Sequence, residues 1–231
     1  MPGLFDPYTL KSVTLRNRIA VSPMCQYSAV DGVVNDWHLV HLGARASGGA
    51  SVVVAEATAV APEGRITSSC AGLWNDAQLD AWRKITRFVA DRGAVPGIQL
   101  AHAGRKASAN RPWEGDDHLA PDDPRAWEIV GPSAVAFGGN LPRVPRAMSL
   151  DDIHRVQRQF ADAATRAHAA GFKWLNLHFA HGYLANSFLS PLANRRDDAY
   201  GGSFDNRARF ALETFAAARA AWPDNLPLTV R

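Results

Sequence analysis

Cysteine and lysine are both scarce in this sequence, and each scarcity narrows the class of protein. Two cysteines, Cys25 and Cys70, in 231 residues do not make a disulfide framework, so we expect a reducing, cytoplasmic location. Most basic residues are dispersed arginines, and the formal net charge is only +3. No basic stripe and no nucleic-acid module occurs, so nucleic-acid binding is not expected.

Long apolar runs are also missing. No segment approaches the roughly 20 apolar residues that a membrane-spanning helix needs. The first residues, Met-Pro-Gly-Leu-Phe-Asp-Pro, do not resemble a signal peptide. Because 47% of the residues are hydrophobic, the chain can bury a sizeable core. We therefore expect one domain over residues 1–231 that does not bind membranes.

Apolar runs typical of buried strands alternate with helical periodicity along the chain. Strands are predicted over Arg18–Cys25, Ser51–Glu56, Pro96–His102, Trp174–Tyr183 and Leu226–Arg231. Helices are predicted from Asn35 to Gly48, around Leu79–Val89, from Ser149 to Gly171 and from Ser203 to Trp222. Residues 1–18 suit a small hairpin, and residues 103–148 form an insertion that adds no strand to the sheet. This alternation predicts an α/β fold with a parallel sheet.

The residues after the first strand distinguish two candidate parallel-sheet folds, a doubly wound sheet and a (β/α)8 barrel. A dinucleotide-binding sheet needs a glycine-rich turn there, but Ser22-Pro-Met-Cys-Gln-Tyr27 contains no glycine. This favours a (β/α)8 TIM barrel. A complete barrel has eight strands and typically about 250 residues. We therefore expect the chain to carry only about the first five β/α units, as a truncated form of a larger protein with an open sheet edge.

Every predicted strand ends in polar or reactive residues. These ends are Ser22–Tyr27, Glu56–Thr58, Gln99 with His102, His178–Tyr183, and Arg231. The carboxyl ends of barrel strands share one face, where barrel active sites lie. The sequence therefore predicts one site built from five strand ends.

His178 and His181, followed by Tyr183, allow three interpretations. The imidazoles could be zinc ligands completed by a third residue. The hydrogen-bonding nitrogens of one or both imidazoles could be paired with backbone groups near a strand end. They could also donate hydrogen bonds to one substrate oxygen, with Tyr183 as a proton donor. The residues alone leave these interpretations open.

The cysteines and two further histidines carry less information. Cys25 is either a small buried side chain or a thiol that faces the site and acts as a nucleophile or tunes a redox centre. Cys70 has no comparable setting, and we expect it to be structural. His38 and His41 lie on a predicted helix, where we expect them to be packed or exposed.

Several motifs along the whole chain resemble the Old Yellow Enzyme family. They include Ser22-Pro-Met-Cys-Gln-Tyr27, Gln99-Leu-Ala-His-Ala-Gly-Arg-Lys106, His178-Phe-Ala-His-Gly-Tyr-Leu184, Asn194-Arg-Arg-Asp197 and Tyr200-Gly-Gly202. Cys25 and the segment Ala109–Trp127 are similar to the thermophilic-type branch, and to its bacterial xenobiotic reductases in particular.

This resemblance implies an FMN-dependent ene-reductase that uses NADPH, or NADH, to reduce enones, maleimides and nitro compounds. It assigns the isoalloxazine ring to Ser22, Pro23, Met24, Ala57 and Gln99, with Arg231 near the flavin N1 and O2. Cys25 would modulate the flavin potential and Tyr27 would line the substrate side. His178 and His181 would bind the substrate oxygen, and Tyr183 would deliver the proton. No metal is needed in this reading.

The resemblance carries further expectations. It implies a small-molecule substrate and a homo-oligomer, either a dimer or a tetramer. The family's phosphate-binding loops follow strands seven and eight, beyond the five predicted here, so we expect poor flavin retention. Residues 111–127 are expected to form a lid whose Trp113 and Trp127 select substrates. The alternatives are a metal-dependent barrel hydrolase using His178 and His181, and a non-catalytic fragment that pairs its open edge with another chain.

Overall fold

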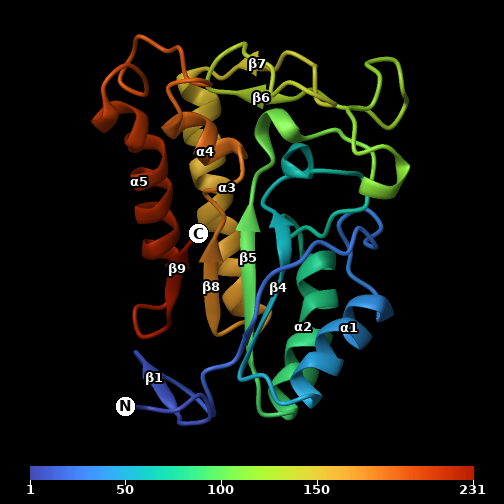
Figure 1. Cartoon of the computed structure of the whole chain (residues 1–231), viewed down its shortest axis with the longest axis vertical. Helices are drawn as coiled ribbons and strands as arrows, with labels where there is room; N and C mark the ends of the chain where they lie inside the picture. The colour runs from blue at the N-terminus through green and yellow to red at the C-terminus, as the bar shows by residue number, and fades with distance from the viewer.

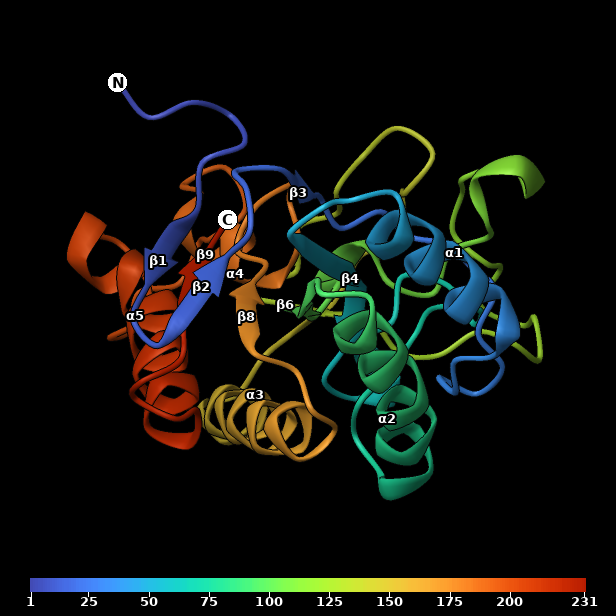
Figure 2. The ribbon, with the colours of Figure 1, turned by 90° about the horizontal axis from the view of Figure 1, so that it is seen from below.

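The computed structural model describes residues 1–231, and its centre is one curved parallel sheet. The strands follow the order β3 (Ala20–Val21), β4 (Val52–Ala59), β5 (Val95–Ala101), β8 (Trp174–Leu177) and β9 (Leu228–Val230). Spatial order repeats chain order without a reversal, whereas a doubly wound sheet reverses at a switch point. The curled arc in Figure 2 confirms the predicted partial barrel.

Four long helices cover the outer side of this arc. They are α1 (Asp36–Ser47), α2 (Asp76–Asp91), α3 (Leu150–Ala169) and α5 (Phe204–Ala221) (Figures 1 and 2). Asn35, Ser149 and Ser203 accept backbone N–H bonds as N-caps, and this confirms the three predicted starts. A cap of this kind stabilises a helix by about 1 kcal/mol. The starts are therefore fixed by local sequence.

The core lies between the sheet and these helices. It is one cluster of 42 buried residues, with Trp82, Phe160 and Phe172 among its largest side chains. The rings of Trp82 and Phe172 meet edge to face with centroids 5.4 Å apart, which joins α2 to the segment before β8. Burying one large apolar side chain stabilises the fold by about 1.5–3 kcal/mol. The core fixes the strand positions and therefore the positions of their ends.

An antiparallel hairpin lies at the amino ends of the strands. It consists of β1 (Tyr8–Leu10) and β2 (Val13–Leu15), and it appears at the bottom of Figure 1. Ser12 donates from its backbone and its hydroxyl to the Asn225 carbonyl at 3.0 and 2.6 Å. The hairpin is therefore fastened to the loop that leads into β9.

Residues 103–148 lie over the opposite end of the sheet. They contain the short 3-10 helices η2 (Gly104–Lys106) and η3 (Pro112–Glu114) and the paired strands β6 (Val130–Gly131) and β7 (Arg146–Ala147) (Figure 1). The Arg196 guanidinium donates to the carbonyls of Pro132 and Met148 at 2.9 and 2.6 Å. This arginine ties the insertion to the loop after α4 (Leu184–Leu189).

The strands β3, β8 and β9 are shorter than predicted, and the short helix α4 and three 3-10 helices were not predicted. β3 holds only Ala20–Val21, since Pro23 has no N–H to continue a ladder. β8 stops at Leu177 because His181 and Gly182 adopt φ values of +60° and +72° and turn the chain into α4. The 3-10 turn η1 (Pro62–Gly64) follows β4.

Among all the helices, none combines the length and the apolar character that crossing a membrane would require.

Candidate active site

His178, His181 and Tyr183 come together at the carboxyl end of β8. The ring centroids of His178 and His181 are 5.0 Å apart, and His178 and Tyr183 are also 5.0 Å apart. The third side of this triangle, from His181 to Tyr183, measures 6.4 Å. Two imidazoles and one phenol therefore share one small region at the mouth of the partial barrel.

The turn after β8 creates this arrangement. The His178 N–H donates to the Leu100 carbonyl at 2.9 Å and so extends the pairing with β5 by one residue. His181 then takes a left-handed conformation, which costs about 1–3 kcal/mol for a residue other than glycine. Gly182 follows, with Phe137 so close that an added Cβ would lie 2.6 Å from its ring. The chain maintains a strained turn where the site is built.

His178 is a neutral hydrogen-bond donor. Its Nδ1 accepts the Ala180 N–H at 3.3 Å, so the ring proton belongs on Nε2. Burial lowers the pKa of His178 to about 4, and the positive charges of His181, Arg231 and Lys106 act in the same direction. The imidazole is therefore uncharged near pH 7 and can donate from Nε2.

Tyr183 keeps its proton in this setting. Burial raises the pKa of its hydroxyl, and negative charge on Cys25, Cys70 and Asp116 adds to the rise. The Lys106 ammonium lies 5.0 Å from the Tyr183 ring centroid and donates to the His181 carbonyl at 3.3 Å. A protonated phenol beside two imidazoles is a proton source for a reacting group.

Cys25 and Tyr27 approach the same region from the loop after β3. Burial raises the pKa of the Cys25 thiol, with smaller contributions from Cys70 and Glu56. Burial also raises the pKa of Tyr27, whose φ of +51° is again left-handed. Tyr27 and Tyr183 line one cavity of about 280 Å³ together with Lys106. The two loops therefore face each other across an open space.

The residues expected on the flavin side end the neighbouring strands. Ser22 and Met24 are exposed, while Ala57 and Gln99 are buried. The Gln99 amide donates to Asn176 Oδ1 at 2.7 Å, and this fixes its orientation. Arg231 is exposed but anchored, because its N–H donates to the Leu177 carbonyl at 3.0 Å.

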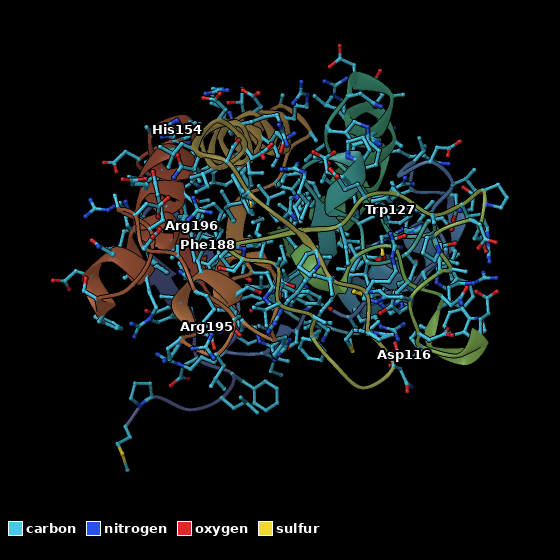
Figure 3. All side chains as sticks on the ribbon, turned by 90° about the horizontal axis from the view of Figure 1, so that it is seen from above. Asp116, Trp127, His154, Phe188, Arg195 and Arg196 are labelled. Atoms are coloured by element: carbon cyan, nitrogen blue, oxygen red, sulfur yellow. The ribbon has the colours of Figure 1, made fainter.

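Two tryptophans of the insertion, Trp113 and Trp127, have different contacts. Trp113 meets Tyr27 edge to face with centroids 5.8 Å apart. Trp127 does not line the cavity; it packs on the cluster of Ala103, Ala107 and Ile129, and its indole N–H donates to the Glu63 carbonyl at 3.0 Å. The role of Trp127 in substrate selection stays a prediction. Figure 3 shows Trp127 and Asp116 on one side of the view and Arg195 and Arg196 on the other.

The contacts of three residues in this region were not predicted from the sequence. Lys106 lines the cavity, but an isolated lysine after a strand has no distinctive pattern. Glu56 and His38 are buried and lie 3.3 Å apart between Oε1 and Nε2. His38 is buried, which agrees with one of the two predictions made for it, that it is packed. Its contact with the Glu56 carboxylate arises only from the tertiary fold. Sequence spacing cannot place two residues from different elements in contact.

A metal centre has little support from the residues present. No group of three or more His, Cys, Asp or Glu side chains converges to hold an ion. His178 and His181 therefore lack a third ligand, which a zinc site in either a structural or a catalytic role requires.

The fold and the site together define a class of oxidoreductase barrel, and the comparisons specify it further. A family model described as the NADH:flavin oxidoreductase / NADH oxidase family matches residues 3–231. The chain belongs to this family, as the resemblance to Old Yellow Enzyme predicted.

Two curated relatives cover nearly the whole chain. It is 45% identical over 230 residues to an NADPH dehydrogenase of Geobacillus sp., a match that covers 99% of this chain and 62% of the relative. It is 44% identical over 230 residues to an NADH:flavin oxidoreductase of Gibberella zeae, covering 99% of this chain and 56% of the relative. The chain thus spans about three fifths of the length of these relatives.

Solved structures agree with this assignment. Morphinone reductase in complex with tetrahydroNAD superposes with a TM-score of 0.87 at 31% identity, covering 100% of this chain and 64% of that one. Old Yellow Enzyme from Pichia sp. superposes with a TM-score of 0.85 at 28% identity, covering 98% and 59%. Both neighbours confirm the partial barrel.

The residues at the strand ends fit a flavin. A flat ring needs small side chains beneath it, and Ala57 and Ala59 in β4, Ala101 at the end of β5 and Ala103 just beyond it are small and buried. The fixed Gln99 amide offers polar atoms to a ring edge, and Arg231 offers a cation. These donors and the small side chains match the two requirements of an isoalloxazine, an apolar face and a polar edge.

Proposed function

We propose that this chain carries the hydride-acceptor site of an FMN-dependent ene-reductase. The substrates are compounds with activated C=C bonds, namely enones and maleimides, and nitro compounds are included. The observation that carries the proposal is the triangle of His178, His181 and Tyr183 at the end of β8.

FMN, when bound, supplies a hydride from its N5. Addition of hydride to the β-carbon of an enone moves negative charge onto the carbonyl oxygen. His178 and His181 are held close enough to donate to that one oxygen, and the neutral state of His178 leaves its Nε2 proton available. Fixed donors at a developing oxyanion are worth about 3–4 kcal/mol each in measured cases.

Tyr183 delivers the proton that completes the reduction. Its hydroxyl stays protonated because burial disfavours the phenolate. Tyr183 also lines the cavity that would hold the substrate, so its proton reaches the α-carbon without passing through bulk water. Tyr27 lines the same cavity and bounds the substrate from the loop after β3.

The cofactor side uses the other four strand ends. Ser22, Pro23, Met24, Ala57 and Gln99 hold the isoalloxazine ring, and Arg231 stabilises negative charge on its pyrimidine side. Cys25 lies beside them and modulates the flavin potential. The small side chains of the neighbouring strand ends and the oriented Gln99 amide support this assignment.

The electron donor and the assembly are part of the proposal. We propose NADPH as the electron donor, with NADH as the alternative. One relative is named an NADPH dehydrogenase, and another is named an NADH:flavin oxidoreductase. The two cysteines are free thiols, which agrees with a reducing cytoplasm. A homo-oligomer is tested by light scattering at several concentrations, and a mass of one chain at all of them would contradict it.

The decisive experiment measures flavin oxidation in a single turnover. FMN is added to the 231-residue chain, reduced with dithionite and mixed with 2-cyclohexenone while the flavin band is recorded. We expect reoxidation in the wild type and a roughly 10²–10³-fold slower rate in His178→Asn, the usual loss for one oxyanion donor. His154→Asn, an exposed change on α3, serves as the control (Figure 3).

Three outcomes would contradict the proposal. If His178→Asn and His154→Asn react as fast as the wild type, the histidine pair does not polarise the substrate. If zinc restores or creates activity in the absence of flavin, a metal-dependent hydrolase replaces the ene-reductase. If gel filtration leaves no FMN bound to the chain at any added concentration, the non-catalytic alternative stands.

A further inference from the structure

Glu56 is a buried carboxylate at an irregular position in β4. Ala55 pairs with Ile98 and Ala57 pairs with Gln99, so Glu56 is the extra residue of a β-bulge. Bulges re-aim side chains and are frequent next to active sites. The Glu56 side chain is only 2% exposed, and a buried carboxylate is costly unless polar groups pair with it.

Two groups from different elements pair with this carboxylate. Its Oε2 accepts the Gln26 backbone N–H at 3.1 Å, and its Oε1 lies 3.3 Å from His38 Nε2. His38 Nε2 makes no hydrogen bond in the structure, so its approach to Glu56 is a close polar contact. The His38 Nδ1 lies 3.2 Å from both the Asn35 backbone nitrogen and the Asn35 Oδ1. In the tautomer in which Nδ1 accepts the Asn35 N–H, the ring proton is on Nε2 and faces Glu56.

Gln26 is the residue between Cys25 and Tyr27. It lies in a segment without regular secondary structure, and Tyr27 there has a left-handed backbone. The Gln26 side chain donates to the Met24 carbonyl at 2.7 Å and accepts the Trp37 indole N–H at 3.1 Å. The Glu56 carboxylate therefore accepts a hydrogen bond from the backbone amide of Gln26, between Cys25 and Tyr27.

The geometry points to a clamp, and we propose that Glu56 is a positioning residue for Cys25 and Tyr27. Through the Gln26 amide it fixes the loop after β3 against the end of β4, and His38 on α1 fixes the carboxylate. The inference rests on the proposed function only for the roles of Cys25 and Tyr27. The clamp itself is a property of this chain and can be measured without flavin.

Two readouts report on the clamp in the 231-residue chain. Hydrogen–deuterium exchange of residues 22–28 reports on the Gln26 amide. Alkylation by iodoacetamide from pH 7 to 10, resolved by peptide mapping from that of Cys70, reports on the Cys25 thiolate. The charged or titratable groups that act on Cys25 are Glu56 on β4, Cys70 in the loop after it, Tyr27 in its own loop and Tyr183 after β8.

Two substitutions separate the hydrogen bond from the charge. Glu56→Ala removes both, so we expect exchange of the Gln26 amide and alkylation of Cys25 each to rise at least tenfold. Glu56→Gln keeps an oxygen for the Gln26 N–H, so exchange should stay within threefold. Its alkylation should still rise severalfold at each pH, because the lost negative charge no longer disfavours the thiolate. A purely structural role would not give this split.

Asp36→Asn is the matched control, because it removes an exposed α1 carboxylate that pairs with Lys84 at 3.1 Å. It should leave both readouts unchanged. Unchanged exchange of the Gln26 amide in Glu56→Ala, with a native circular dichroism spectrum, would overturn the proposal. If Glu56→Ala fails to fold, unchanged exchange of that amide in Glu56→Asp, whose carboxylate is one methylene shorter, would overturn it. A failure of the His178→Asn experiment would remove the ene-reductase assignment and leave these measurements unaffected, so the two hypotheses fail separately.

Discussion

The imidazole of His178 and the phenol of Tyr183 lie 5.0 Å apart between ring centroids, with their planes at 85°. A left-handed His181 and a left-handed Gly182 separate them in sequence. Because this turn reverses the chain, an imidazole and a phenol from the end of a single strand lie edge to face. The relationship is the physical basis of the proposed chemistry, and the first predictions test it.

His178 should remain neutral well below the usual pH for histidine. Its pKa in the folded chain is about 4, chiefly because it is buried, against 6.5 for an ordinary imidazole. We expect the NMR resonances of the His178 ring in labelled protein to titrate near pH 4. A His178 midpoint above 6 would show that the ring is charged at the site.

The same shift predicts a loss of stability on acidification. Between pH 6.5 and 4 the unfolded chain binds a proton at residue 178 and the folded chain does not. Stability therefore falls as the pH is lowered through this window, in accordance with proton linkage. Urea melts of wild type and His178→Gln at pH 7 and pH 4.5 measure the effect, and the wild type should lose more stability than the variant.

Removing the Tyr183 hydroxyl should slow protonation without disturbing the fold. Tyr183→Phe keeps the ring that packs against His178 and Lys106. We expect the rate of enone reduction to fall by about 10²–10⁴-fold, the range for loss of a general acid. Product deuteration in D₂O identifies the step. Tyr8→Phe, an exposed change in the hairpin, is the control; equal rates for Tyr183→Phe and wild type would exclude Tyr183 as the donor.

Gly182→Ala should destabilise the chain more than Gly139→Ala does. Both glycines have positive φ, at +72° and +58°, but an added Cβ would lie 2.6 Å from Phe137 Cε2 only at residue 182. The backbone term is of order 1–3 kcal/mol for each, and the contact with Phe137 adds to it at Gly182. Urea melts of both variants give the difference. Equal losses would mean that Phe137 yields freely.

The start of α3 should depend on pH through Asp152. Arg146 donates to Asp152 Oδ2 at 2.7 Å, and this hydrogen bond is the main reason that the pKa of Asp152 is lowered. Because the folded pKa lies below the unfolded one, the stabilisation is present above pH 4 and is lost as the pH falls. Asp152→Asn should cost about 1.5–3 kcal/mol at pH 7, the value of a charged hydrogen bond.

The pH dependence of the Asp152→Asn effect separates the charge of Asp152 from its packing. The difference in urea midpoint between the wild type and Asp152→Asn should shrink between pH 4 and pH 2. Asp151→Asn, at the neighbouring exposed position, should show no such change. A constant difference for Asp152→Asn would assign its effect to packing at the helix start.

The sequence alone determined the elements and their order. Asn35, Ser149 and Ser203 marked helix starts because a cap needs only a few adjacent residues. Continuous apolar runs identified the parallel strands, and the absence of glycine after the first strand favoured a barrel. His178, His181 and Tyr183 could be singled out because they follow one strand directly.

Only the tertiary structure decided how residues from different strands meet. The bulge at Glu56, its contact with His38 and the Gln26 amide, and the entry of Lys106 into the cavity join segments far apart in the chain. The contacts of Trp127 could not be predicted for the same reason, since its neighbours at Glu63 and Ala107 lie outside its local sequence. Local propensity acts over a few residues, whereas burial and long-range hydrogen bonds depend on the whole packed fold.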